Sequence, residues 1–498
     1  MTRPTTQVRA LLALRWQMAR TPGLRLGLVL GAVGLAWLLQ VVLTSADALD
    51  APTLATAVEL APSTFLGFGV LAVIAPLTAG GGNEVVPPDQ LAPHPVRPST
   101  QFLGGLVLAP LNLVWVVQLL ALAAMTAYLS LDGSLWRGAI TTTLYVLCLT
   151  VLGQAVAWLV VGLRQTRAGR RTTGAAVAVL LLTAVVVVRS GRGTEVLAAS
   201  PTRGVVRAIT ENGSTTWALT TASLLGLVVL GLLVGAGLCG WALRRPGDAG
   251  SARQLEPVRR RSSRRTVQRE LRAVDRASVW RAPALRRGGL VLAVLPGLLA
   301  AGAAVPWESL IVLPGLVAAG AGLLFGVNAF CLDGSGALWL ASLPHDPGRV
   351  ARAKAAVLGE TVLAAVIIAA TAGALRSPGT PTATEVSGIV AAGLACSAVV
   401  VATCMRNSVR RPHRADLHGV RDAVAPPGAL AFASLRLATP TALIGVLIAS
   451  TATGDAWWLP LALGTAVVLG AGLSLNRTLR RYEDPVVRAR VVQVVGAG

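Results

Sequence analysis

Residues that could do catalytic or metal chemistry are few in this 498-residue sequence. Its four histidines are His94, His345, His413 and His418. The last two, with Asp416 between them, could offer ligands to a metal, but zinc sites usually need three or four ligands at closer spacing. The five cysteines show no C-x-x-C spacing and lie in or beside apolar segments, as reduced core residues do. We therefore expect no metal site in this chain.

The sequence also lacks the motifs of nucleotide hydrolysis and of other hydrolases. Lys354 is the only lysine and follows Arg352-Ala353, so the G-x-x-x-x-G-K-[ST] phosphate-binding loop cannot form. No G-x-S-x-G or H-E-x-x-H motif is present, and no pair of carboxylates lies within an apolar run. We therefore predict that the chain is not an enzyme and has no catalytic residues or cofactor of its own.

Two polar loops share one spacing pattern. Residues 80–100 are GGGNEVVPPDQLAPHPVRPST and residues 328–349 are NAFCLDGSGALWLASLPHDPGR; each contains Leu-Ala-x-x-Pro-x-x-Pro and lies between apolar segments. Ordinary short turns would explain one such loop, but a proline-stiffened loop used twice is typical of a docking element that passes movement to its neighbouring helices. The residues predicted to form the two docking hairpins are Asn83, Glu84, Asp89, Pro95 and Arg97 in the first and Asp333, Leu343, Pro344, His345 and Asp346 in the second.

The elements that must position these hairpins are membrane helices. The chain is 54% hydrophobic and only 13% charged, with a mean hydropathy of +0.67, and its apolar residues fall in blocks near the roughly 20 residues that cross a bilayer. The fold class predicted is an all-α polytopic membrane protein with about twelve spans. The predicted spans are 25–45, 61–82, 101–130, 138–163, 173–189, 217–243, 288–305, 309–330, 353–375, 386–405, 432–452 and 456–475.

The net charge of +22 follows from arginines gathered in the loops of one side of the membrane. This asymmetry obeys the positive-inside rule, so we expect both termini in the cytoplasm, a bacterial plasma membrane and contact with membrane lipids. Nucleic acid is not an expected partner, because no basic stripe is interleaved with aromatic residues. Residues 189–216 depart from the rule, and their Val/Ile/Arg pattern predicts a short interfacial helix on the outer face.

The chain contains an internal repeat. Arg-x-Pro-x-Leu-Arg occurs at 20–25 and again at 281–286, each time before a Gly-Leu-Val-Leu run, and the two polar hairpins follow in the same order. We therefore expect two parallel six-helix repeats. The domains predicted are 1–243, beginning with an interfacial helix; 244–287, an Arg-rich cytoplasmic linker with a second interfacial helix; and 288–498.

Ionisable residues are scarce in the middle of the predicted spans. Glu360 and Arg436 are expected near helix ends, where a long side chain can reach the interface. A proton-coupled antiporter usually needs a titratable residue at mid-membrane depth, so this pattern argues against that class.

Taken together, these motifs resemble those of the type-2 family of ABC export permeases, in the fused two-half form of high-GC bacteria. The likeness rests on the interfacial helix before each half, on Gly82-Asn83-Glu84 with Pro95-Val96-Arg97-Pro98, and on Asn328…Leu332-Asp333-Gly334…Leu343-Pro344 followed by Arg352-Ala353-Lys354.

The resemblance implies that the hairpins are coupling helices seated in two copies of a separately encoded ABC ATPase, which carries ATP and Mg. It also implies that residues 189–216 cap the translocation path, whereas the matching connection at 451–456 is too short to do so. The expected function is export of a hydrophobic or amphipathic compound such as a drug or antibiotic, a lipid or a peptide. The alternatives are a secondary transporter and a membrane scaffold subunit without transport activity.

Overall fold

The computed structural model describes the second half of the chain almost completely and the first half in part. The described residues are 40, 61–62, 64–70, 72, 97–108, 113–130, 135–190, 192, 195, 199–211, 213–245, 266–413, 427–452, 454 and 456–496. All regular elements within them are helical. The first interfacial helix, most of the span predicted at 25–45, and four residues of the first hairpin (Asn83, Glu84, Asp89 and Pro95) lie outside these ranges.

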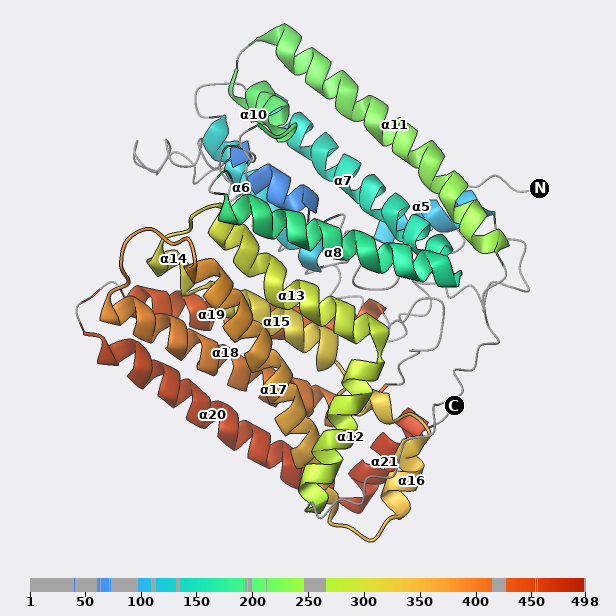
Figure 1. The fold of residues 1–498 in the computed structure, drawn as a ribbon, viewed down its shortest axis with the longest axis vertical. Helices are drawn as coiled ribbons and strands as arrows, with labels where there is room; N and C mark the ends of the chain where they lie inside the picture. Colours follow the sequence, from blue (N-terminus) through green and yellow to red (C-terminus); the bar gives the residue numbers. More distant parts are fainter. Residues whose placement is uncertain are drawn as a thin grey trace. The chain divides into compact units, whose positions relative to one another are not determined.

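The chain forms two compact units, the first from residues 1–180 and 190–250 and the second from 181–189 and 251–498. The described helices that lie before residue 250 are α5 (Pro98–Leu108), α6 (Leu113–Leu129), α7 (Leu135–Arg164), α8 (Arg167–Arg189), α10 (Thr202–Thr210) and α11 (Ser214–Arg244). The long helices α7 and α11 lie side by side (Figure 1). Gly162 of α7 faces the ring of Trp241 in α11 with no room for a Cβ, so a small residue permits this close approach.

Two features of the first unit bear on the sequence-based predictions. The range predicted as one span, 101–130, holds two helices, α5 and α6, on either side of residues 109–112, which the structure does not describe. The short helix expected within 189–216 is present as α10, which buries Val205, Val206 and Ile209 against its neighbours. Alternation of these apolar residues with exposed arginines explains why the segment forms an amphipathic helix rather than a span.

From residue 266 onwards, the described part of the second unit contains eleven elements. They are α12 (Val267–Arg281), α13 (Pro283–Gly302), α14 (Trp307–Leu310), α15 (Leu313–Phe325), the 3-10 turn η3 (Cys331–Asp333), α16 (Gly336–Ser342), α17 (Pro347–Ala374), α18 (Ala383–Arg410), α19 (Pro427–Thr451), α20 (Trp458–Glu483) and α21 (Pro485–Gly496). Helices α15, α17 and α18 pack around a core that includes the fully buried Val317, Val362, Val400 and Met405.

Among the described residues, seven helices are long and apolar enough to cross a membrane: Leu135–Arg164, Ser214–Arg244, Leu285–Gly302, Trp307–Phe325, Pro347–Ala374, Ala383–Arg410 and Trp458–Glu483. Arg436–Thr451 is a shorter apolar helix. The chain is therefore an all-α protein with the helices of a multi-pass membrane protein.

The helices differ from those expected in three respects. Helix α17 begins at Pro347 rather than near residue 353, because Asp346 caps it and a proline at its first position has the backbone angle that a helix needs. Glu360 and Arg436 consequently lie inside α17 and α19 rather than near helix ends, so that expectation was wrong. Helix α21, which follows the last span, was not predicted. The range in which a second interfacial helix was expected, 244–287, contains the helix α12.

Candidate functional site

The second hairpin, residues 328–346, is an ordered structure rather than a loose loop. It consists of η3, a sharp turn at Gly334, the seven-residue helix α16, and Leu343–His345 leading into α17. Gly334 has φ 48° and ψ −135°, a backbone conformation that only glycine adopts readily. At the other end, the Asp346 side chain accepts a hydrogen bond from the Gly348 amide at 2.9 Å and so caps α17.

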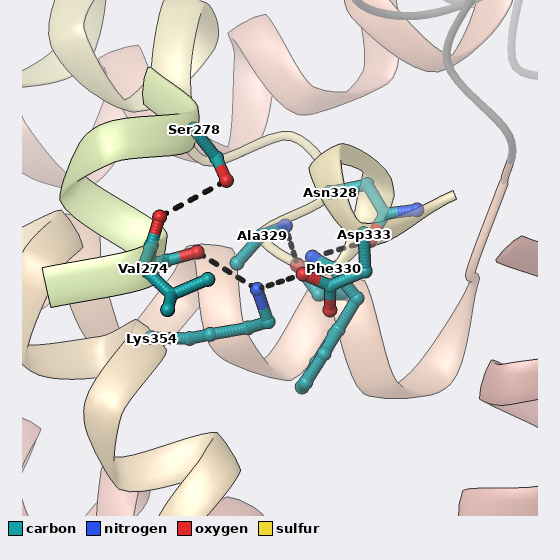
Figure 2. Close-up of polar contacts among 9 residues, drawn as sticks. Val274, Ser278, Asn328, Ala329, Phe330, Asp333 and Lys354 are labelled. Atoms are coloured by element: carbon teal, nitrogen blue, oxygen red, sulfur yellow. Dashed lines mark hydrogen bonds and ion pairs between the residues drawn. The ribbon is translucent and has the colours of Figure 1, made fainter. Parts of the chain in front are cut away.

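A buried lysine joins this hairpin to two helices. The Nζ atom of Lys354 in α17 lies 2.8 Å from Oδ1 of Asp275 in α12 and 2.8 Å from Oδ1 of Asp333 in η3. Figure 2 shows the ammonium group between the α12 backbone at Val274 and the turn that carries Asp333. We call Asp275, Asp333 and Lys354 the buried ion triad.

The three charged side chains of the triad are largely buried, which is energetically costly for each of them alone. The Lys354 side chain is 4% exposed, and those of Asp275 and Asp333 are 11% and 19% exposed. Burial raises the pKa of the Asp333 carboxyl, and the positive charge of Lys354 acts in the opposite direction. Because each ion is costly to bury alone, the three side chains stabilise the fold only while they remain together. The hairpin, α12 and α17 are thereby held as one body.

Aromatic contacts extend this body to the end of α20. The Phe330 ring stacks on Tyr482 with centroids 4.8 Å apart and an interplanar angle of 11°. Lys354 Nζ lies 5.7 Å from the centroid of the same Phe330 ring. Helix α21 packs against α16 and η3 (Figure 1), and a cavity of about 110 Å³ lies beside Tyr482, Asp333 and His345. Burial raises the pKa of the adjacent Cys331 thiol to about 12, which disfavours its thiolate form.

The start of the hairpin is fixed to the end of α18. The Asn328 side chain accepts a hydrogen bond from the Phe330 amide at 3.1 Å and donates one to the carbonyl of His413. The Ala329 amide donates to Ser408 Oγ at 2.9 Å. Asn328, Ala329 and Phe330 appear together in Figure 2. Asn328, the first residue of the hairpin, therefore has a structural role, which is to close the loop onto α18.

A second ion pair links α12 to α17 at the surface. Arg276 donates to both carboxylate oxygens of Glu360, at 2.6 and 2.8 Å, and this two-fold hydrogen bond raises the pKa of the guanidinium. Both side chains are substantially exposed, at 53% and 39%. This pair joins α12 to α17, but it is far more accessible to water than the triad.

The tip of the hairpin exposes apolar side chains. Trp339 is 77% exposed, and Leu338 and Leu343 are about half exposed. Exposed tryptophan on a short helix held by buried contacts is a common feature of binding surfaces, since its large apolar face gains most when a partner covers it.

The residues predicted for the second hairpin have different roles in the structure. Asp333 belongs to the buried ion triad, Leu343 and Pro344 are exposed at the tip, and His345 is half-buried. Asp346 caps α17 and forms an ion pair with Arg352 at 2.7 Å. Of the five residues predicted for the first hairpin only Arg97 is described; its carbonyl accepts a hydrogen bond from the Thr100 amide at 3.0 Å, in the first turn of α5.

Sequence reasoning missed Lys354 and Asp275 as partners of Asp333. The available signal was that Lys354 is the only lysine among 44 basic residues, in an otherwise apolar segment. Asp333 lies only 21 positions before Lys354 in the sequence, but no sequence pattern indicates that Asp275 also lies beside Lys354 in the folded chain.

The described part of the chain contains no group of three or more His, Cys, Asp or Glu side chains placed to hold a metal ion. Comparison of the chain with protein-family models, with curated proteins and with solved structures found no match.

Proposed function

We propose that this chain is the membrane-spanning permease of an ABC exporter and that separately encoded ATPase subunits hydrolyse ATP. The observation that carries the proposal is the second hairpin, which presents Trp339 and Leu343 outward while Asp333 is fixed to Lys354. A docking element must combine an accessible apolar tip with a rigid base, and residues 328–346 have both.

The buried contacts at the base of the hairpin suggest how a docked partner would act on the helices. A partner that pushes on α16 would act on α17 through Lys354 and on α12 through Asp275, because one ammonium joins all three elements. Nucleotide-dependent closure of the ATPase subunits would favour one arrangement of these helices over another only if the contacts differ between the two states. The hairpin thus provides a route by which hydrolysis changes the packing of the spans.

Several finer features belong to the same proposal. They are about twelve spans in two parallel six-helix repeats, a second docking hairpin around Asn83–Arg97, and both termini on the cytoplasmic side of a bacterial plasma membrane. Support comes from the repeated sequence patterns and from the arginine asymmetry. Hydrophobic or amphipathic cargo is proposed because the spans are rich in small and apolar residues.

The test uses substitutions at the exposed tip, where no buried contact is lost. The chain carrying Trp339→Ala and Leu343→Ala is compared with the wild type by mild-detergent purification from cells that express its native operon, followed by a vanadate-sensitive ATPase assay. We expect wild type to retain an ATPase subunit and the double variant to lose it.

The matched control is Trp458→Ala, which removes a similarly exposed tryptophan (57%) at the far end of α20 from Tyr482. This variant should keep the ATPase. Equal retention of activity by the tip variant and the wild type would refute the docking role of α16. A wild-type chain that purifies without any ATPase from an expressed operon would instead favour a secondary transporter or a scaffold.

A further inference from the structure

A basic cavity of about 690 Å³ opens between α12, α17 and α20. Its polar lining includes Gln268 and Arg272 from α12 and Arg349 and Arg352 from the first turns of α17, while Leu475 and Leu479 of α20 supply apolar lining. The volume lies within the range of about 300–1,000 Å³ that is usual for sites of small molecules. The exposed tip residues Trp339 and Leu343 do not line this cavity.

The charges around the cavity favour an anion. The cavity is lined by three guanidinium groups but only one carboxylate, that of Asp346. The oxygens of this carboxylate already accept hydrogen bonds from Arg352 at 2.7 Å and from the Gly348 amide at 2.9 Å. Arg349 lies 3.9 Å from the same carboxylate, too far for a hydrogen bond. Donors of Arg349 are therefore available to another acceptor.

Arg272 adds a further donor. Its Nε atom is buried and makes no hydrogen bond to any described residue. The neighbouring carboxylate of Glu360 is held by Arg276 through two short hydrogen bonds and is not a hydrogen-bond partner of Arg272. A buried guanidinium nitrogen without an acceptor is costly, so a ligand that supplies an oxygen there would gain that energy on binding.

The position of the cavity relative to the membrane-spanning part of α17 favours a lipid over a free anion. Arg349 and Arg352 lie in the first turns of α17, before the apolar stretch of the same helix that is long enough to cross a membrane. The end of a span coincides with the headgroup layer of the bilayer. The leucines of α20 and the alanines Ala355 and Ala356 of α17 continue the cavity with apolar surface, which suits the start of an acyl chain.

From this arrangement we infer that the basic cavity binds the phosphate headgroup of an anionic phospholipid, with Arg272 and Arg349 as its main ligands. Guanidinium groups bind phosphate through paired, charge-assisted hydrogen bonds. Basic pockets between helices at the cytoplasmic membrane surface are sites at which anionic headgroups bind. The inference depends only on the chain being a membrane protein and not on the exporter function proposed above.

The experiment measures lipid binding by the intact, purified chain. Protein in vesicles containing equal amounts of phosphatidylglycerol and phosphatidylcholine is released in mild detergent, and retained lipids are counted by native mass spectrometry. Thermal stability is also measured during titration with each lipid. We expect preferential, saturable binding of phosphatidylglycerol. This binding should be weakened about a hundredfold in Arg272→Gln/Arg349→Gln, since each of the two lost charge-assisted hydrogen bonds is worth about tenfold or more.

The matched control is Arg269→Gln/Arg480→Gln, which removes the same charge from exposed positions of α12 and α20 that do not line the cavity. This control should bind phosphatidylglycerol as the wild type does. Equal weakening in both double variants would show general attraction to the basic surface and would overturn the site. Arg349→Gln alone, at a half-exposed side chain, provides a second test if the cavity variant does not fold.

A titration with inorganic phosphate separates the two sources of the anion. If inorganic phosphate neither raises the melting temperature of the protein appreciably nor displaces bound phosphatidylglycerol, the lipid assignment is supported. Displacement of phosphatidylglycerol by inorganic phosphate, with stabilisation of equal size, would show a site for the free anion and would contradict it.

Discussion

The ammonium of Lys354 lies 2.8 Å from the Asp333 carboxylate, and this contact joins the turn before α16 to the interior of α17. Asp275 completes the arrangement from α12 at the same distance. A hairpin connected only by its peptide chain could move independently of the spans. With a buried cation shared by three elements, displacement of the hairpin requires α12 and α17 to move with it or the ions to separate.

The first prediction concerns the stability of the buried ion triad. Replacing Lys354 by methionine keeps an unbranched side chain only one heavy atom shorter but leaves Asp275 and Asp333 buried without their cation. We expect the free energy of unfolding to fall by about 3–5 kcal/mol, the usual cost of removing one partner from a buried ion pair. Denaturant unfolding in mild detergent, followed by circular dichroism, measures this loss.

Two control variants distinguish the loss of a buried ion from a general effect of changing charge on stability. A triple variant, Lys354→Met with Asp275→Asn and Asp333→Asn, should recover much of the lost stability because no buried ion remains. Glu360→Gln, which breaks the exposed pair with Arg276, should leave stability nearly unchanged at moderate salt. A Lys354→Met protein as stable as the wild type would show that the triad does not hold the hairpin.

The second prediction concerns the turn at Gly334. Its φ of 48° with ψ of −135° is strained for any residue with a Cβ, although a Cβ there would meet no atom within 4 Å. Gly334→Ala should therefore destabilise the protein by about 1–3 kcal/mol through the backbone alone. Gly336→Ala is the matched control, because Gly336 also has open space but lies in α16 without a positive φ; it should be neutral or slightly stabilising. Equal melting temperatures of the two variants would contradict this explanation.

A third prediction separates the two roles of Asp346, which caps α17 and pairs with Arg352. Asp346→Ala removes both and should cost about 0.5–2 kcal/mol, the range for lost N-caps. Asp346→Asn keeps an oxygen that can cap the helix and should retain most of the stability, because the ion pair with Arg352 is half exposed. Thermal melting of the two variants in the same detergent distinguishes these outcomes; equal losses would assign the stability to the charge instead of the cap.

The fourth prediction is a pH dependence caused by His413. Burial lowers the pKa of this imidazole below its ordinary value of about 6.5, so the folded protein binds the proton less readily than the unfolded chain does. The contribution of His413 to stability is therefore complete above pH of about 6.5 and is lost as the pH falls through that value towards the lower folded-state pKa.

His413→Gln removes the titrating group and leaves the backbone carbonyl that accepts the Asn328 hydrogen bond. Melting curves recorded from pH 5 to pH 8, about the range in which histidine titrates, should show a steeper acid-side loss for the wild type than for this variant. Parallel curves would mean that the imidazole is not buried in the neutral form.

The sequence by itself determined the class of protein and the approximate positions of many of its helices. Apolar blocks near membrane-spanning length and scarce charge fix an all-α membrane protein, because lipid offers no partners to an unpaired backbone. The amphipathic helix α10 could be predicted from its mixed Val/Ile/Arg pattern, whereas a helix in the range of α12 was expected from the repeated Arg-x-Pro-x-Leu-Arg element. The repeated Leu-Ala-x-x-Pro-x-x-Pro spacing located the second hairpin, although its function remains a prediction.

Only the tertiary structure showed how that hairpin is held. Asp275, Asp333 and Lys354 are separated by up to 79 positions in the chain, and no local pattern indicates that they meet. The start of α17 was placed too late because an apolar run reports the buried part of a helix, whereas Asp346 and Pro347 extend it into polar sequence. The basic cavity likewise requires α12, α17 and α20 to be brought together, since its arginines resemble ordinary surface charge until packing surrounds Arg272 with neighbours that offer its Nε no acceptor.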